Sequence, residues 1–211
     1  MKTIALFGGT GKTGQIVLQN ALKAGFKVKA LVRDANKVTI KSNDLTVIEG
    51  DILDAAAVDN TVVGCDIVLS LFGHVKNSPE WLQTNGTKNI IQSMDKFQVD
   101  RIISLSGGGL PFPSHDRPKF ADKMIRTIMK IAVPKILNDA ISHAEILKSS
   151  NKKWMIVRGP RLTNDPKAGN YRVGWVGVNA STKISRGDLA DFIISQIDDE
   201  RFNFQMPFVS N

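Results

Sequence analysis

The sequence predicts an α/β fold, in which a doubly wound parallel sheet carries helices on both faces. Short apolar runs alternate with helical patterns along the first two-thirds of the chain, and a glycine-rich turn follows the first run. Each apolar run is nearly continuous, which is typical of parallel strands covered on both faces. Apolar residues make up 42% and charged residues 23% of the 211 residues, as in ordinary globular domains.

The predicted elements follow one another as strand and helix. We expect strands at residues 4–7, 28–32, 45–48, 67–71, 102–105 and 154–157. We expect helices at residues 12–24, 55–63, 80–97 and 121–149, the last broken near Pro134 because proline lacks a backbone N–H. Repeated units of this kind imply right-handed crossovers between neighbouring strands.

The alternation ends after Arg158. Residues 171–178 and 180–184 are strand-like, and Ser185 and Asp188 form a capping box before a helix predicted at residues 189–197. We expect one domain over residues 1–211, with its core at about 1–158 and a small C-terminal portion at about 159–211. This portion should lean over the carboxyl edge of the sheet and complete a substrate cleft, because ligands bind at that edge in such folds.

The stretch GGTGKTG, which begins at Gly8, distinguishes between two kinds of nucleotide site. A P-loop needs a glycine five positions before Gly11, and Leu6 stands there, so a P-loop is excluded. Gly9, Gly11 and Gly14 instead fit a dinucleotide turn, and a second register begins at Gly8. We expect this turn and the N-terminus of the following helix to face a pyrophosphate.

The end of the second predicted strand bears on which dinucleotide is bound. An acidic residue at this place holds the ribose hydroxyls of NAD, whereas an arginine accommodates the 2′-phosphate of NADP. Arg33, with Lys37 nearby, predicts a preference for NADP(H), and Asp34 leaves NAD(H) possible. The alternative for Arg33 is a solvated loop arginine.

Further motifs follow the glycine turn in order: ALVRD, GDI, LFG, NSP, GTKNII, ISLSG, IVRGPRLT and ISRGDLA. Together they resemble the atypical short-chain dehydrogenase/reductase superfamily, and within it the NAD(P)-binding proteins similar to biliverdin-IXβ reductase, also called flavin reductase. The resemblance covers nearly the whole chain and implies a Rossmann-like fold.

The resemblance also implies a cofactor site drawn from five segments. It places Gly8, Thr10, Gly11, Lys12, Thr13 and Gly14 at the pyrophosphate, Arg33 at the 2′-phosphate, Asp51 and Ile52 beside the adenine, Leu71, Phe72 and Gly73 beneath the ribose, and Pro160, Arg161 and Leu162 near the nicotinamide. A simpler interpretation of Asp51 is a turn residue at a strand end.

The acid–base pair of the wider superfamily is missing. That pair is Tyr-x-x-x-Lys on the helix after the fifth strand, and the one tyrosine here, Tyr171, lies outside residues 121–149. Ser106 matches the superfamily's active-site serine and either orients the acceptor or caps backbone groups. We expect an NADPH-dependent reductase of a flat conjugated acceptor such as a flavin or quinone. The alternatives are a non-catalytic NADP(H)-sensing regulator and, less expected, an NAD-dependent epimerase or isomerase.

Other candidate groups carry weaker signals. His74 is the best placed of three histidines for a proton donor, although each histidine also suits a structural role, and no metal-ligand spacing is present. The loop at residues 107–119 is either a mobile lid that offers Phe112 to a flat substrate or a passive surface loop. Residues 123–130 are basic and amphipathic, which fits a membrane surface, but we expect a core-facing helix.

Charge and cysteine content suggest the partners and the compartment. The net charge of +8 is scattered along the chain, so we expect an anionic small molecule as partner, with no nucleic acid and no membrane. The single cysteine, Cys65, fits a reducing compartment, and no signal peptide is recognisable, so we expect a cytoplasmic protein. We expect a monomer or weak homodimer.

Overall fold

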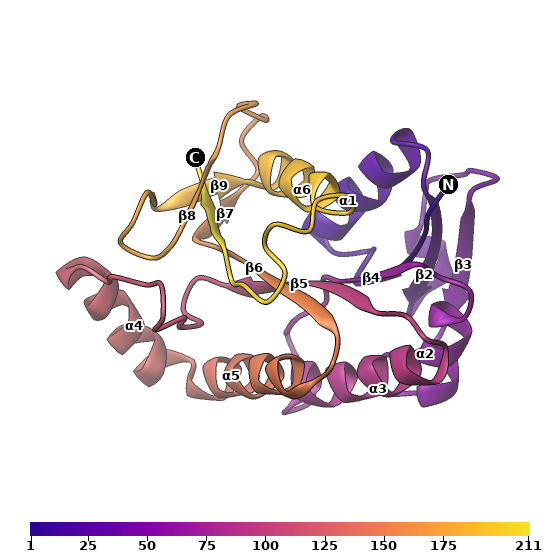
Figure 1. The fold of residues 1–211 in the computed structure, drawn as a ribbon, viewed down its shortest axis with the longest axis horizontal. Coiled ribbons are helices and arrows are strands. Elements are labelled where there is room, and N and C mark those ends of the chain that lie inside the picture. Colours follow the sequence, from indigo (N-terminus) through magenta and orange to yellow (C-terminus); the bar gives the residue numbers. More distant parts are fainter.

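An eight-stranded sheet crosses the centre of the molecule (Figure 1). The computed structural model describes residues 1–211. The strands of the sheet are β1 (Thr3–Phe7), β2 (Lys27–Val32), β3 (Leu45–Glu49), β4 (Ile67–Ser70), β5 (Arg101–Gly107), β6 (Lys153–Gly159), β8 (Arg172–Gly174) and β10 (Phe208–Ser210). Their order is β3-β2-β1-β4-β5-β6-β10-β8, and every neighbouring pair is parallel except β10 with β8. The chain therefore has the predicted α/β, Rossmann-like architecture.

Helices cover both faces of this sheet. They are α1 (Lys12–Lys23), α2 (Ala55–Val62), α3 (Leu82–Lys96), α4 (Phe120–Ala132), α5 (Pro134–Ser149) and α6 (Arg186–Ser195). Figure 1 shows α1 and α6 side by side on one face and α2, α3 and α5 on the other. A separate parallel pair joins β7 (Arg161–Thr163) to β9 (Lys183–Ser185). None of the helices combines the length and apolar character needed to span a bilayer.

The apolar runs are continuous because each strand serves two cores. In β1, Ile4 and Leu6 belong to the core beneath α1 and α6, whereas Ala5 and Phe7 belong to the core beneath α2 and α3. Successive side chains of a strand point to opposite faces, so both faces of β1 need apolar residues. This confirms the interpretation of the runs as strands of a doubly covered sheet.

The predicted elements of the first two-thirds are confirmed to within a few residues. Pro134 is the first residue of α5, where its missing N–H leaves no helical bond unmade, and it separates α5 from α4 as predicted. Ser185 Oγ accepts the backbone N–H of Asp188 at 3.0 Å, so α6 begins at Arg186, three residues earlier than predicted.

The C-terminal third differs from the prediction. It does not simply lean over the carboxyl edge, because β10 and β8 extend the sheet beyond β6 and α6 packs beside α1. The strand-like stretches contract to three residues each, β8 and β9. Pairing with a neighbouring strand, rather than local propensity, decides the length of such short strands.

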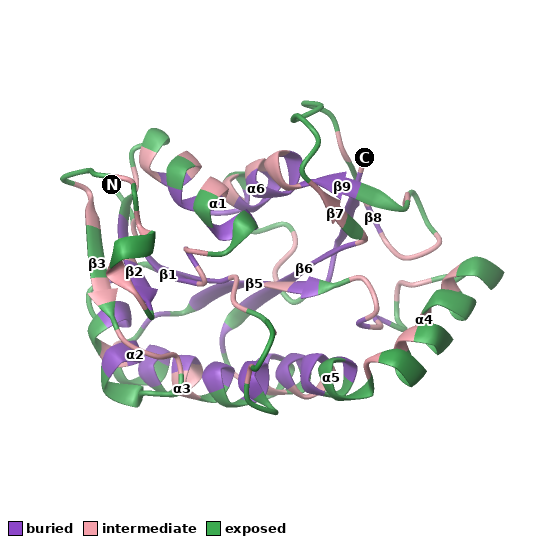
Figure 2. Cartoon of the chain, turned by 180° about the vertical axis from the view of Figure 1, so that it is seen from behind, coloured by how far each residue is buried: buried purple, intermediate pink, exposed green.

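Helix α4 also departs from expectation. None of its residues is buried, so the prediction of a core-facing helix is wrong. Figure 2 shows α4 exposed along its length at one end of the molecule.

Arg158 forms the main charged contact of the interior. Its guanidinium is fully buried in β6 and donates two hydrogen bonds of 2.8 Å to the carboxylate of Asp116. Its remaining bonds, both 2.8 Å, go to the carbonyls of Leu110 and Met206. Asp116 in turn accepts the backbone N–H groups of Phe112 and Val176. The pair therefore fastens the loop after β5 to the sheet, which argues against a freely mobile lid.

Breaking this pair should destabilise the chain strongly. Asp116→Asn leaves the Arg158 charge buried without a counter-ion, which should lower the free energy of unfolding by about 3–5 kcal/mol. Urea unfolding measures the loss. Asp165→Asn, which breaks an exposed contact with Lys183, is the control and should leave the midpoint unchanged. Equal midpoints for Asp116→Asn and the wild type would contradict the role of the pair.

His143 is a structural histidine of the core. Its Nδ1 lies 2.7 Å from Thr87 Oγ1 and its Nε2 lies 3.1 Å from Ser104 Oγ. Burial lowers its pKa to about 4, against an opposing effect of Asp139. His143 therefore stays neutral in the folded chain and is no candidate for the proton donor.

This burial predicts a pH-dependent stability. Between pH 6.5 and about 4 the unfolded chain binds a proton that folded His143 does not. Stability is therefore fully present above pH 6.5 and is lost as the pH falls, by about 3 kcal/mol at pH 4. The free energy of unfolding, measured with urea at several pH values in this range, should change less steeply with pH for His143→Gln than for the wild type. His115 lies in a surface loop, so His115→Gln should keep the pH dependence of the wild type. A weaker pH dependence in this variant would argue against His143 as the group that causes it.

Candidate functional site

The glycine turn between β1 and α1 has a backbone that only glycine fits at two positions. Gly8 has a φ of 86°, and a Cβ built on it would lie 2.6 Å from the backbone nitrogen of Phe72. A Cβ on Gly14 would collide with the carbonyl oxygen of Gly8. Gly14 thus lets the start of α1 approach the backbone of the turn closely. The turn is closed by a 3.1 Å bond from the Gly11 N–H to the Gly8 carbonyl.

The N-terminus of α1 is open at the end of this turn. Gly11 is its N-cap and no side chain caps it, and both Gly11 and Lys12 are exposed. The first N–H groups of a helix have no acceptor within the helix and carry partial positive charge. These groups, with Thr10 and Thr13 beside them, can hold a diphosphate.

The residues predicted for the adenosine end lie at the carboxyl ends of β2 and β3. Arg33 follows β2, is exposed and has no ion-pair partner, whereas Asp34 accepts the N–H of Asn36 at 3.0 Å as the cap of a short 3₁₀ helix. Asp51 Oδ1 accepts the N–H of Leu53 at 2.8 Å, so the turn role of Asp51 is present. Its second oxygen has no partner within the chain.

The side chains of Ile52 and Phe72 both pack against Gly86 of helix α3. A Cβ on Gly86 would lie 2.7 Å from a side-chain carbon of each, so this glycine makes room for both. Asn89 donates to the Ile52 carbonyl at 3.0 Å and fixes the turn after β3. Leu71, directly after β4, packs partly against the core, and Gly73 is exposed. The structure therefore brings the segments at Asp51 and Leu71 to one edge of the sheet.

A buried carboxylate beside this edge was not predicted as part of the site. Asp139, on α5, accepts the backbone N–H groups of Gln83 and Thr84, the Thr84 hydroxyl and His74 Nε2, the last at 2.6 Å. Burial raises the pKa of Asp139, but these bonds outweigh it and the net pKa is lowered. An ionised carboxylate only accepts, so His74 Nε2 donates and Nδ1 remains free. The sequence carried no signal for this pair, because 65 residues separate its members.

Ser106 lies near the end of β5, opposite Arg158 of β6. It is buried, and its Oγ has no hydrogen-bond partner. The capping role that the sequence left open therefore has no support in the structure. Four other buried side-chain atoms also lack a partner, but the Ser106 hydroxyl lies near the carboxyl end of β5, the edge at which ligands bind in such sheets.

A cavity of about 640 Å³ opens beyond the end of β5, where Gly107, the residue after Ser106, lines it together with the loop that follows β5. Pro160 and Arg161 line it as well, whereas Leu162 packs in β7 on the core. Most of the lining is apolar or backbone, and its charged members are Asp116, Asp122, Arg126 and Arg161.

Neither Phe112 nor Tyr171 presents its ring to a substrate. Phe112 is buried, and its ring stacks on His115 with centroids 4.7 Å apart, so it is not offered to a substrate. Tyr171 packs edge-on against Phe192 of α6. The cavity thus has no tyrosine, in agreement with the missing acid–base pair.

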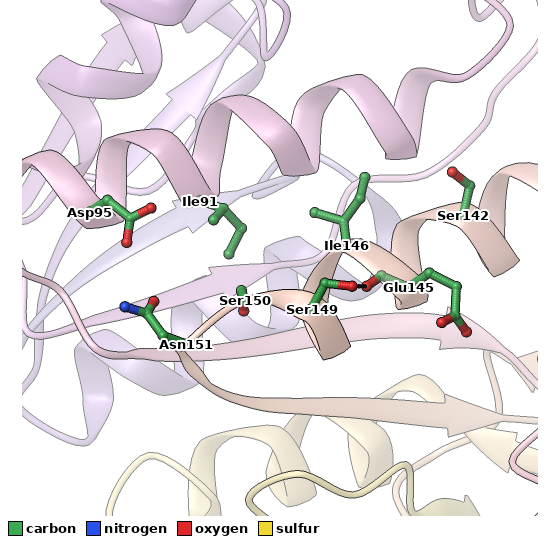
Figure 3. A pocket seen from close by; sticks show the side chains of 8 residues that line it. All are labelled: Ile91, Asp95, Ser142, Glu145, Ile146, Ser149, Ser150 and Asn151. Atoms are coloured by element: carbon green, nitrogen blue, oxygen red, sulfur yellow. Dashed lines mark hydrogen bonds between the residues drawn. The ribbon is translucent and has the colours of Figure 1, made fainter.

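A second hollow lies elsewhere, between α3 and α5 (Figure 3). It measures about 700 Å³ and is lined mainly by polar side chains, among them Asp95, Glu145 and Ser149. Ser149 Oγ bonds the Glu145 carbonyl at 2.8 Å within the same helix. None of its lining residues belongs to the turn or the cavity, and no three metal-ligating side chains gather there or elsewhere.

Comparison with known proteins agrees with this geometry. The pattern of the NAD(P)H-binding family matches residues 8–200. YwnB of Bacillus subtilis is 25% identical over 210 residues, covering 93% of this chain and 91% of YwnB. A short-chain dehydrogenase/reductase from Veillonella parvula, solved in complex with NADP, has a TM-score of 0.83 at 18% identity and covers 100% of this chain and 94% of its own.

ChuY, an anaerobilin reductase from Escherichia coli O157:H7, has a TM-score of 0.79 at 19% identity, covering 99% of this chain and 96% of its own. At these identities the solved structures establish the shared fold. The family match covers most of the chain and includes the turn after β1. The chain therefore belongs to the NAD(P)H-binding family, as its dinucleotide turn predicted, and it shares the fold of a short-chain dehydrogenase/reductase.

Proposed function

We propose that this chain is an NADPH-dependent reductase that delivers hydride to a flat conjugated acceptor, such as a flavin or a quinone. The observation that carries the proposal is the position of Ser106. Its unpartnered hydroxyl lies at the same edge of the sheet as the dinucleotide turn, and the next residue, Gly107, lines a largely apolar cavity. Ligands of open α/β sheets bind at this edge.

The residues of the edge fit NADP(H). The cradle left by the missing Cβ atoms of Gly8 and Gly14, together with Thr10, Gly11, Lys12 and Thr13, would hold the pyrophosphate at the start of α1. Arg33 is exposed and unpaired, so it would pair with the 2′-phosphate, while the engagement of Asp34 in a cap disfavours NAD(H). Asp51, Ile52, Leu71, Phe72 and Gly73 would contact the adenosine, and Pro160, Arg161 and Leu162 the nicotinamide end. The bound dinucleotide supplies the hydride.

The cavity fits the acceptor. Its volume is within the range of about 300–1,000 Å³ that small-molecule sites span. Ser106 would donate a hydrogen bond to a carbonyl oxygen of the acceptor and orient its ring. Arg126 and Arg161 add positive charge to the wall, and the Nε of Arg126 is buried without a partner. Positioning of this kind suffices where the cofactor carries the difficult step.

The role of Arg33 predicts a selective loss of NADPH affinity. Arg33→Ala removes a charge-assisted bond and should weaken NADPH binding by about 1.5–3 kcal/mol. Titration of the protein with NADPH and with NADH, by quenching of its tryptophan fluorescence, measures both affinities. NADH should be nearly unaffected, and Lys23→Ala, at the far end of α1, should change neither. An equal loss for both cofactors would argue against a 2′-phosphate site.

The role of Ser106 predicts a loss of turnover without a loss of stability. Ser106→Ala removes one hydrogen bond to the acceptor, which should lower kcat/KM by about 5- to 10-fold, and NADPH affinity should stay unchanged. Its Oγ bonds nothing in the chain, so the melting temperature should not fall. Ser104→Ala removes a bond to His143 and should lower the melting temperature instead.

Stopped-flow measurements with NADPH and FMN, riboflavin or menadione follow this turnover. Unchanged kcat/KM in Ser106→Ala would contradict the proposed contact. NADPH that binds tightly but is oxidised by no acceptor would support the alternative of a non-catalytic sensor. Conversion of a sugar nucleotide would support an epimerase.

A further inference from the structure

Helix α4 presents an apolar strip that no other part of the chain covers. Four side chains form the strip, and their exposed fractions are 83% for Phe120, 50% for Met124, 56% for Ile128 and 78% for Ile131. At 3.6 residues per turn, these positions fall within about 80° around the helix. Figure 2 shows the helix projecting from the rest of the fold, with most of its length exposed and the remainder of intermediate burial. Such a contiguous exposed patch indicates a binding surface.

Positive charge borders this strip. Lys123 and Lys130 run along one flank of α4, and Lys119 stands at its N-terminus. None of the three forms a salt bridge. The segment from Arg117 to Lys135 contains six basic residues and one acidic residue. The surface is therefore complementary to an anionic one.

We propose that α4 docks on an anionic lipid surface, with the apolar strip in the headgroup boundary and the lysines at the lipid phosphates. An amphipathic helix with lysines beside a strip of Phe, Met and Ile is suited to this position. A second copy of the chain fits less well. In an antiparallel pair of α4 helices equivalent flanks face each other, which would bring Lys123 and Lys130 against the same lysines of the other copy.

The side of α4 away from the strip belongs to the candidate active site. Asp122, Arg126 and Met129 line the cavity, so docking of α4 would hold the cavity beside the lipid surface. This step rests on the proposed function. It assigns the acceptor to the class of apolar conjugated molecules that partition into lipid, such as a quinone with a long alkyl chain.

Flotation of the full chain with vesicles tests the docking. Vesicles with phosphatidylglycerol in phosphatidylcholine should carry the protein, vesicles of phosphatidylcholine alone should not, and high salt should weaken binding. Lys123→Gln with Lys130→Gln should weaken it about tenfold or more, as should Ile128→Ser with Ile131→Ser. The matched controls are Lys41→Gln with Lys88→Gln, which change the net charge equally, and Val63→Ser, an exposed apolar position on α2's C-terminal side.

The outcomes separate the docking from the catalysis. Equal recovery with both kinds of vesicle, or equal loss in the charge-matched control, overturns the docking. A dimer in light scattering that the Ile128 and Ile131 changes dissociate assigns the strip to a second copy and also overturns it. If menadione oxidises NADPH but the chain does not bind vesicles, the docking is rejected and the reductase proposal stands. If the chain binds vesicles but no quinone is turned over, the reductase proposal is rejected and the docking stands.

Discussion

The ion pair between Arg158 and Asp116 determines how the carboxyl edge of the sheet is built. A guanidinium is always charged, and taking it out of water is costly unless its donors are satisfied. Arg158 meets this demand with one carboxylate and two carbonyls that come from the loop after β5 and the segment before β10. Asp116 also accepts the backbone N–H of Val176, from the segment after β8. Three segments distant in sequence are thereby fixed around one cavity.

A second chain of contacts connects the dinucleotide turn to α5. Gly8 lies against the backbone of Leu71 and Phe72, and Phe72 lies against Gly86 of α3. The start of α3 is in turn held by Asp139, which also binds His74. Helix α5 therefore contributes a carboxylate that holds the start of α3 and His74 in place. Both oxygens of the Asp139 carboxylate accept hydrogen bonds from groups of the chain itself.

The sequence predicted what depends on local pattern. The strands at the centre of the sheet, the glycine turn and the helix break at Pro134 all follow from periodicity and backbone chemistry within a few residues. Contacts such as that between His74 and Asp139 depend on which residues the fold brings together, and no local pattern encodes them. The amphipathicity of α4 was visible in the sequence, but a pattern of two faces does not reveal whether anything covers the apolar one. The three-residue β10 exists because β6 offers it an edge, which is again a tertiary effect.

The groups around the cavity constrain the kind of reduction it can support. Asp116 binds Arg158 and two backbone N–H groups; its burial opposes ionisation, but these bonds outweigh burial and its pKa is lowered. Asp122 accepts the N–H of Lys119 as part of the α4 cap. A carbonyl that becomes an alkoxide needs a proton from a nearby acid as it is reduced, and this cavity lacks the tyrosine that would give one. A conjugated acceptor spreads the added charge over its ring and can take its proton from solvent afterwards. The groups of the wall thus fit the proposed conjugated acceptor better than a simple aldehyde or ketone.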